Sequence, residues 1–273
     1  VDDFAPANPS SRARLEFGPA RNGVEVTFDL VIDLGGGDAL MSVPEKRDGY
    51  FRPDPDNPAL IQKALLEATD LVGEFEKPIY VTFHDNLCAH SRSAITGCTR
   101  CLDVCSTSAI TPAGDHVQID HAVCAGCGDC SSVCPTGAAA YAMPQGEILL
   151  LRLRTLLAGY FEAGGKDPMV LVHDTRHGEE LIGLASRFGR GLPARVLPFA
   201  VNEITQTGID FLTTAFAFGA NGIRILVPPA KRDELDGLTA PTDLAGRIPA
   251  GLGFGSDRIA LLDFQDAVKG WDA

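Results

Sequence analysis

The stretch that decides the fold spans residues 124–135 and reads CAGCGDCSSVCP. Its four cysteines are separated by two, two and three residues, and a proline follows the last one. Three thiolates at two-residue gaps can wrap three irons of one cubane, whereas a fourth thiolate on the following helical turn points toward a second cluster. This spacing therefore predicts an iron–sulfur site, because four cysteines at these offsets, closed by proline, rarely arise by chance.

A second copy of this pattern precedes the first in the chain. All eight cysteines lie between Cys88 and Cys134. Aligning residues 81–105 on residues 117–134 pairs their apolar positions and their cysteines, and leaves seven extra residues, 90–96, after the first cysteine. Each copy is expected to form a short strand, a cysteine loop and a short helical turn. Ser106 departs from the pattern, because it stands where the other copy has proline.

The two copies, together with the hairpin at residues 109–120 that links them, resemble the bacterial-type ferredoxin with two [4Fe–4S] clusters. This resemblance implies crosswise ligation, in which the fourth cysteine of each run serves the other cluster. One cluster would take Cys88, Cys98, Cys101 and Cys134, and the other Cys124, Cys127, Cys130 and Cys105.

Structural zinc and disulfides are the alternatives for these cysteines. Pairs of cysteines two residues apart also bind zinc, but zinc sites rarely use three cysteines at successive two-residue gaps. Disulfides are disfavoured because the cysteines are crowded into one segment, unlike those of a secreted scaffold. We therefore expect two [4Fe–4S] clusters as cofactors.

Composition limits the classes of partner. The chain has 273 residues, enough for two or three small domains. Its net charge of −13 argues against nucleic acid and anionic membranes as partners, and suits a carrier that docks on basic patches. The most apolar piece, residues 148–161, is too short for a bilayer span and contains Arg152 and Arg154. We expect no membrane insertion.

The cellular location of the protein and the completeness of the chain are inferred from less specific features of the sequence. No export signal pattern is present, and reduced cysteines are expected, so the sequence predicts a cytoplasmic protein. The chain begins at Val1, and residues 266–273 read like a helix that is cut short. These ends favour a fragment of a longer polypeptide, with a processed complete protein as the alternative.

Three parts are expected along the chain: an α+β lead-in at residues 1–77, the ferredoxin-like cluster module at 78–146, and an α/β docking domain at 147–273. The lead-in should hold a polar arm at 1–13, a strand at 25–32 and a helix at 59–75. The apolar face of that helix should include Ile61, Leu65, Leu66, Thr69 and Val72. The glycines at 35–37 predict a plain turn, since no Walker lysine or helix follows them.

The last part shows an alternating rhythm of strands and helices. A helix is expected at 147–163. Strands are expected at 169–173, 194–199, 223–227 and 258–262, with helices at 178–188 and 208–217. Short apolar strands that alternate with helices predict a small doubly wound parallel sheet, covered on both faces.

Several polar residues and two prolines follow the strands of this sheet, at the edge where open α/β sheets bind ligands. They are His173, Asp174, Arg176, His177, Asn202, Glu203, Pro228, Pro229 and Lys231. The first group could bind an anionic group or a flavin; the alternative is a solvated loop whose histidines have internal partners. The run GRGLPA at 189–194 imitates a dinucleotide fingerprint but follows a helix, so we reject it.

A closer family resemblance rests on three segments: CAHSRS at 88–93, GCTRCLDVC at 97–105 and LPFAVNEITQ at 197–206. These resemble the 4Fe-4S binding proteins encoded beside formate dehydrogenases in proteobacteria. The α/β half, with FGANG at 218–222, is also loosely similar to the delta subunit of methyl-viologen-reducing hydrogenases. That subunit relays electrons through a cluster of its own. This chain has no cysteine after Cys134, so the resemblance does not extend to a relay through residues 150–273.

These observations favour an electron-transfer protein over a stand-alone enzyme, and no catalytic residue is assigned. The two clusters would pass single electrons to or from a larger redox enzyme, for which the resemblance implies formate dehydrogenase, while the α/β domain docks. The alternatives are an assembly or maturation factor for that dehydrogenase, and an oxidoreductase subunit that binds flavin or nucleotide. The polar insert at 90–96, with Arg92, should loop out beside the first cluster and raise its potential.

Overall fold

The computed structural model describes residues 4–6, 14–17, 25–27, 29–40, 48–73, 76–92, 95–232 and 235–263. The chain forms two compact units. The first comprises Val1–Tyr80 with Cys105–Ala125, and the second comprises Val81–Val104 with Gly126–Ala273. The division passes through the segment that holds the cysteines. The expected domain boundaries after residues 77 and 146 stay predictions.

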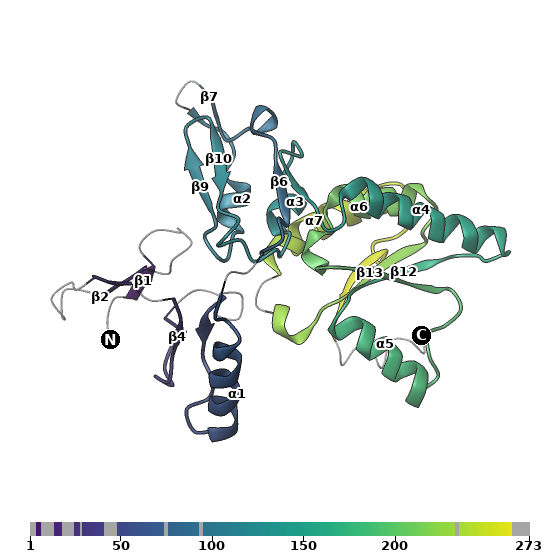
Figure 1. Cartoon of the computed structure of the whole chain (residues 1–273). Coiled ribbons are helices and arrows are strands. Elements are labelled where there is room, and N and C mark those ends of the chain that lie inside the picture. The colour runs from purple at the N-terminus through teal and green to yellow at the C-terminus, as the bar shows by residue number, and fades with distance from the viewer. Residues whose placement is uncertain are drawn as a thin grey trace. The chain divides into compact units, whose positions relative to one another are not determined.

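In the residues that the structure describes, the first unit contains small sheets, one helix and a hairpin (Figure 1). Its strands are β1 (Phe4–Pro6), β2 (Arg14–Phe17) and β3 (Glu25–Thr27) in one antiparallel sheet, and β4 (Val31–Ile32) and β5 (Tyr50–Phe51) in a parallel pair. The hairpin pairs β9 (Ile110–Ala113) with β10 (His116–Ile119), as the sequence predicts.

Two expectations for this unit are corrected. The single strand predicted at 25–32 is two short strands in different sheets, and three residues of the predicted arm form β1. The residues at 35–37 are not helical, in line with a plain turn. The terminal segment 266–273 lies outside the described residues.

Helix α1 (Pro58–Thr69) begins where Asn57 caps it, because the Asn57 side chain accepts hydrogen bonds from the backbone N–H groups of Ala59 and Leu60. It ends six residues before the predicted end. The predicted apolar face is also wrong: Leu65, Leu66 and Val72 are exposed, whereas the buried residues are Ala64 and Ala68. Packing here selects the small side chains and leaves the larger ones in solvent.

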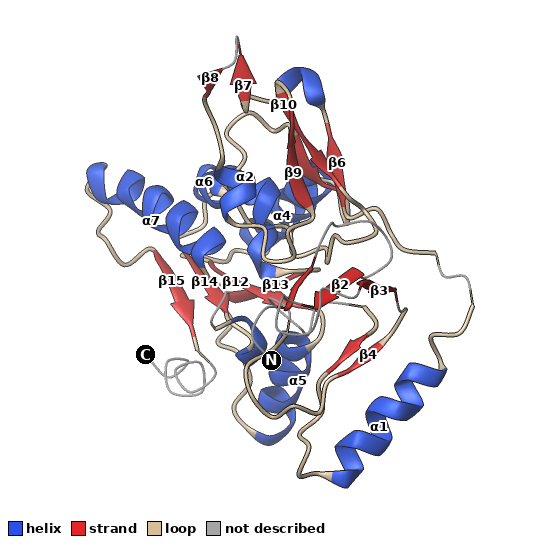
Figure 2. Ribbon diagram, turned by 90° about the vertical axis from the view of Figure 1, so that its left-hand side faces the viewer, coloured by secondary structure: helices blue, strands red, loops and turns tan. Residues whose placement is uncertain are grey.

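The second unit is built on a parallel sheet of four strands in the order β13-β12-β14-β15 (Figure 2). These strands are β13 (Val196–Val201), β12 (Met169–Asp174), β14 (Gly222–Leu226) and β15 (Ile259–Leu262). Helix α4 (Gly146–Glu162) precedes the first of these strands, and α5 (His177–Phe188), α6 (Ile209–Ala217) and α7 (Asp236–Gly251) lie between them along the chain. The predicted fold class, a dicluster ferredoxin region joined to an α/β parallel sheet, is confirmed.

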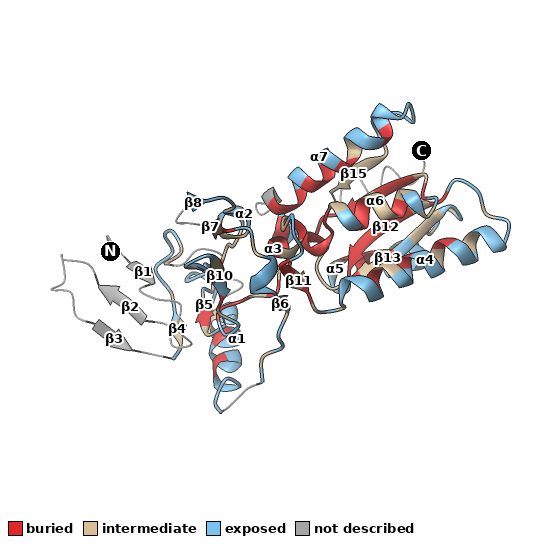
Figure 3. Cartoon of the chain, turned by 90° about the horizontal axis from the view of Figure 1, so that it is seen from above, coloured by how far each residue is buried: buried red, intermediate tan, exposed pale blue. Residues whose placement is uncertain are grey.

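Both faces of the sheet are covered, which is why its strands are mainly apolar (Figure 3). Helices α4, α6 and α7 pack on one face, with fully buried side chains such as Leu153, Leu212 and Ile225. Helix α5 packs on the other face through Leu181, against Leu171 and Leu226. Each such leucine contributes roughly 1.5–3 kcal/mol by its burial. The part of the chain that the structure describes has no helix long and apolar enough to cross a membrane.

Helix α7 is absent from the sequence-based expectations. It contains Pro241 and Pro249, and a proline inside a helix removes a backbone hydrogen bond, so the sequence argues against a helix here. Burial of Leu238 and Ala245 in the core of the sheet stabilises the helix in spite of its prolines.

The cluster segment of this unit consists of short elements. Strand β6 (Val81–Phe83) pairs antiparallel with β11 (Ala139–Tyr141). Between them along the chain lie the 3-10 turn η3 (Asp85–Leu87), the strands β7 (Ser91–Arg92) and β8 (Ile95–Thr96), and the helices α2 (Arg100–Asp103) and α3 (Asp129–Ser132). Two further 3-10 turns, η4 (Ile204–Gln206) and η5 (Pro229–Lys231), follow β13 and β14.

Candidate iron–sulfur centre

Three cysteine thiols lie near the Cys101 thiol within the second unit. Burial, followed by the neighbouring thiols of Cys134, Cys98 and Cys88, raises the pKa of the Cys101 thiol to about 11, because desolvation and like charges both disfavour the thiolate. These four thiols are therefore neighbours. They are the set that the ferredoxin resemblance implies for one cluster, with Cys134 coming from the other run.

Strand pairing brings the two distant runs together. Residue Cys88 follows β6 and η3, whereas Cys134 lies five residues before β11, and β6 pairs with β11. The His84 N–H also donates to the Ala138 carbonyl at 2.8 Å. Helices α2 and α3, which carry Cys101 and Cys130, pack against each other. The ends of the segment are thereby held side by side.

The surroundings of Cys134 favour its thiolate form. Burial acts to raise the pKa of this thiol, but hydrogen bonds from the backbone of Ala139, Thr136 and Ala138 and from the Thr136 hydroxyl outweigh burial and lower it. The Ala139 nitrogen lies 3.5 Å from the sulfur, and the Thr136 hydroxyl oxygen 3.7 Å. Thiolate is the form that ligates iron, so these donors fit a cluster ligand.

The seven-residue insert forms a hairpin rather than an irregular loop. Ser91 pairs with Thr96, and Arg92 with Ile95, while Ser93 and Ala94 lie outside the described residues. Buried His90 closes the base of the hairpin. Its carbonyl accepts from the N–H groups of Gly97 (2.7 Å) and Cys98 (3.2 Å), and its Nδ1 lies 2.8 Å from the Cys98 carbonyl oxygen. The insert is thus tied to the backbone of a predicted ligand.

The second predicted set is divided between the two units. Cys127 and Cys130 belong to the second unit, and Cys105 and Cys124 to the first. The Cys105 sulfur lies 3.8 Å from the Thr107 hydroxyl oxygen. Joint ligation by these four cysteines stays a prediction.

Single-ion geometry differs from cluster geometry. In the described ranges, no three His, Cys, Asp or Glu side chains are arranged to hold one metal ion. A cubane takes one thiolate per iron, so its ligands surround a volume and need not converge on a point. Four neighbouring cysteines, one of which accepts hydrogen bonds from backbone N–H groups, fit such a cluster. The bound cluster would supply one-electron oxidation and reduction.

The carboxyl edge of the parallel sheet holds the second cysteine loop. The Thr205 hydroxyl donates to the Cys127 carbonyl oxygen at 2.6 Å. The Tyr141 hydroxyl donates to the Gly126 carbonyl oxygen at 2.7 Å and accepts from the Asn202 side chain at 2.6 Å. Open α/β sheets bind their ligands at this edge. Here part of the edge is in contact with the chain's own cysteine loop.

The same loop is packed closely against turn η4 and helix α7. Gly128 has a φ of +86°, and a Cβ atom there would lie only 2.8 Å from the Cβ of Gln206. The Ser132 hydroxyl donates to the Gly237 carbonyl oxygen at 3.2 Å, at the start of α7. The amide of Gln206 is buried and has no hydrogen-bond partner within the described part of the chain. Gln206 and Cys134 both line a groove of about 320 Å³.

The loop after β12, for which the sequence left a ligand site and a loop with internally paired histidines open, has internal partners. The Asp174 carboxylate accepts from the backbone N–H groups of His177 (3.0 Å) and Gly178 (2.6 Å), and so caps α5. The ring of His173 is buried, with its Nδ1 2.9 Å from the Asp174 carbonyl oxygen. Farther along this edge, Lys231 pairs with Glu203 at 2.7 Å. These contacts favour the alternative in which the loop is structural.

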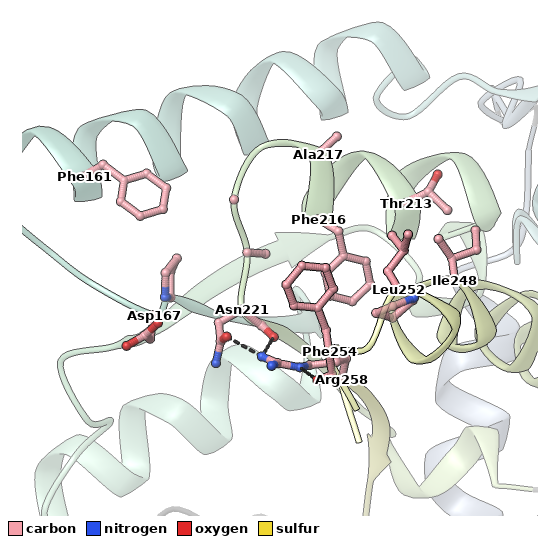
Figure 4. Close-up of a pocket in the computed structure, with 14 residues that line it drawn as sticks. Phe161, Asp167, Thr213, Phe216, Ala217, Asn221, Ile248, Leu252, Phe254 and Arg258 are labelled. Atoms are coloured by element: carbon pink, nitrogen blue, oxygen red, sulfur yellow. Dashed lines mark hydrogen bonds between the residues drawn. The ribbon is translucent and has the colours of Figure 1, made fainter. Parts of the chain in front are cut away.

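A larger cavity of about 480 Å³ lies at the opposite, amino end of the strands (Figure 4). Its wall is mainly apolar and includes Phe161, Phe216 and Phe254. The Arg258 guanidinium donates to the backbone and side chain of Asn221, and its Nε donates to the Phe254 carbonyl oxygen at 2.7 Å. The sequence gives no signal for this cavity, because part of its wall is the unpredicted helix α7.

Comparison with protein families supports the cluster assignment. The model of the 4Fe-4S dicluster domain matches residues 96–138. The chain contains a 4Fe-4S dicluster domain. This domain carries two [4Fe–4S] clusters and implies electron transfer. The matched range includes seven of the eight cysteines and begins after Cys88. Searches of curated proteins and of solved structures gave no match.

Proposed function

We propose that this protein relays single electrons between its two [4Fe–4S] clusters and a larger redox enzyme. The observation that carries the proposal is the proximity of the Cys88, Cys98 and Cys134 thiols to Cys101, with three of these four cysteines inside the segment that matches a dicluster domain. Cys88, Cys98, Cys101 and Cys134 would hold one cluster. Cys105, Cys124, Cys127 and Cys130 would hold the other. Two clusters in one short segment suit stepwise passage of single electrons.

Charge and resemblance indicate the kind of partner. The net charge of −13 favours a partner with a basic docking patch, because complementary charge speeds the encounter. The segments at 88–93, 97–105 and 197–206 resemble proteins encoded beside formate dehydrogenases, so formate dehydrogenase is the partner to test first. The α/β domain would contribute to docking.

Electron transfer in the purified complex tests this proposal. The anaerobically reduced protein is mixed with oxidised formate dehydrogenase, and bleaching or recovery of the cluster absorption is followed by stopped flow. We expect fast transfer that slows as the salt concentration rises, because salt screens the docking charges. A matched run with cluster-free protein measures the background. Binding without electron transfer, together with activation of immature dehydrogenase, would instead support the maturation factor.

A further inference from the structure

Turn η4 of the α/β domain contacts a predicted cluster ligand directly. Its middle residue, Thr205, has a fully buried side chain whose hydroxyl donates to the carbonyl oxygen of Cys127 at 2.6 Å. Thr205 follows Cys127 by 78 residues, so this contact is tertiary. Gln206, the next residue of the turn, lies against Gly128. A side chain at residue 128 would have no room between the turn and the cysteine loop. The hydrogen bond is therefore held in place by packing.

The preceding carbonyl of the loop has a similar partner. The Gly126 carbonyl accepts from the Tyr141 hydroxyl, and this hydroxyl is oriented by the Asn202 amide at the end of β13. Two successive carbonyls of the cysteine loop thus accept hydrogen bonds, one from Thr205 at the carboxyl edge of the sheet and one from Tyr141 of β11, whose hydroxyl Asn202 at that edge contacts. Cys130, at the other end of the loop, is buried as well.

These hydrogen bonds act on the charge of a bound cluster. A hydroxyl that donates to a peptide carbonyl draws electron density toward that carbonyl, so the N–H of the same peptide group becomes a stronger donor. For Cys127 that N–H belongs to Gly128, in the loop between the predicted ligands Cys127 and Cys130. Stronger donors near the sulfurs stabilise the reduced cluster, because it is the more negative state. Burial strengthens the effect, since little water is present to screen it.

We propose that turn η4 raises the reduction potential of the cluster bound by Cys127 and Cys130, through the hydrogen bond from Thr205 to the Cys127 carbonyl. Thr205 is a positioning residue, since it acts through the ligand loop. The α/β domain then has a second role besides docking: it tunes the cluster whose ligand loop it contacts. This inference rests on the proposed function, in which these cysteines are ligands.

The turn offers a matched pair of variants. Thr205 and Thr207 are both fully buried, and each donates a hydrogen bond of 2.6 Å. Thr207 donates to Ile204 within the turn, whereas Thr205 donates to the cysteine loop. In both Thr205→Val and Thr207→Val, a methyl group replaces a buried hydroxyl and the shape is kept. The two changes differ chiefly in which carbonyl loses its donor.

The readout is the midpoint potential of each cluster, from redox titration of the anaerobic holoprotein followed by EPR. We expect Thr205→Val to shift the potential of one cluster to more negative values than wild type and Thr207→Val, with the other cluster unchanged. Repeating both changes in a Cys134→Ala background, where the cluster of Cys127 should be the intact one, identifies the cluster that shifts. Tyr141→Phe, which removes the donor to Gly126, should shift the same cluster in the same direction.

Equal potentials in Thr205→Val and Thr207→Val, or equal shifts of both clusters, would overturn the inference. If Thr205→Val does not fold, the Tyr141→Phe variant provides the test. An unchanged cluster potential in Tyr141→Phe would also overturn the inference. Iron and sulfide analysis of the wild-type protein separates this failure from failure of the proposed function. Two clusters with unaltered potentials refute the tuning alone, whereas a wild-type protein without them refutes the function.

Discussion

Replacing Gly128 by alanine tests whether the cysteine loop and the α/β domain are held as one packed structure. Gly128 lies between two predicted ligands and has a φ of +86°, where residues with a Cβ are strained. The added Cβ would lie 2.8 Å from the Cβ and 2.9 Å from the Cα of Gln206. Neither atom is the end of a flexible side chain, so the loop or turn η4 must move.

A matched glycine separates the two costs of this change. Gly137 has a φ of +70°, and a Cβ there would meet no atom within 4 Å. Gly137→Ala should therefore cost only the backbone term, about 1–2 kcal/mol. Gly128→Ala should cost that term plus the overlap with Gln206, for which overpacking typically adds about 1–3 kcal/mol. The total for Gly128→Ala is then about 2–5 kcal/mol.

Unfolding rates under anaerobic conditions measure the difference. Cluster loss makes unfolding irreversible, so the rate in guanidinium chloride is the suitable quantity. It is followed by far-UV circular dichroism and by the visible absorption of the clusters. When the strain is relieved in the transition state of unfolding, each ~1.4 kcal/mol of strain accelerates unfolding about tenfold. We expect Gly128→Ala to unfold roughly five to a hundred times faster than Gly137→Ala.

Equal unfolding rates for the two alanine variants would refute the packing argument. A Gly128→Ala protein that unfolds like wild type would refute the backbone argument also. The double variant Gly128→Ala with Gln206→Gly is a further check, because removing the Gln206 side chain takes away the nearest colliding atom. It should recover part of the overlap cost, and no recovery would indicate that the collision lies elsewhere.

Three other predictions concern the clusters. The anaerobic protein should carry about eight irons and eight sulfides, as two cubanes require, and stoichiometric zinc with negligible sulfide would contradict this. A double variant Cys101→Ala with Cys134→Ala should keep about four irons, because both residues serve one cluster. The double variant Cys127→Ala with Cys134→Ala should keep few or none, because it damages both clusters. If the second double variant kept more iron than the first, ligation would stay within each run. Excising residues 90–96 should lower the potential of the first cluster, since Arg92 and the hydroxyl groups favour its reduced state. A potential that is unchanged or higher after excision, in a titration followed by EPR, would refute that reasoning.

Local chemistry explains what could be predicted from the sequence. The cysteine offsets are short-range and specific, so the order of residues along the chain is enough to predict the two-cluster module. The alternation of apolar strands with helices predicted the parallel sheet, and helix α4 lies within one residue of its expected ends. In these segments the local preference and the tertiary packing agree.

Elsewhere tertiary packing overrides local preference. Helix α7 forms in spite of two prolines because its buried residues complete the core of the sheet. Helix α1 leaves its leucines exposed and buries Ala64 and Ala68. The sequence left two interpretations of the loop at 173–177, a ligand site and a structural loop, and the hydrogen bonds from the start of α5 to Asp174 favour the structural one. In sequence, polar residues at a strand end that bind a ligand cannot be distinguished from those that cap a helix.

The sequence by itself determined which residues carry the chemistry, because cysteine spacing encodes a cluster and βα alternation encodes a parallel sheet. Only the tertiary structure decided what surrounds that chemistry. The hydroxyl of Thr205 reaches Cys127 across 78 residues, and Asn202 reaches Tyr141 across 61 residues. Such contacts leave no periodic or spacing signal in the chain, because they exist only once the sheet has formed and its carboxyl edge meets the cysteine loop.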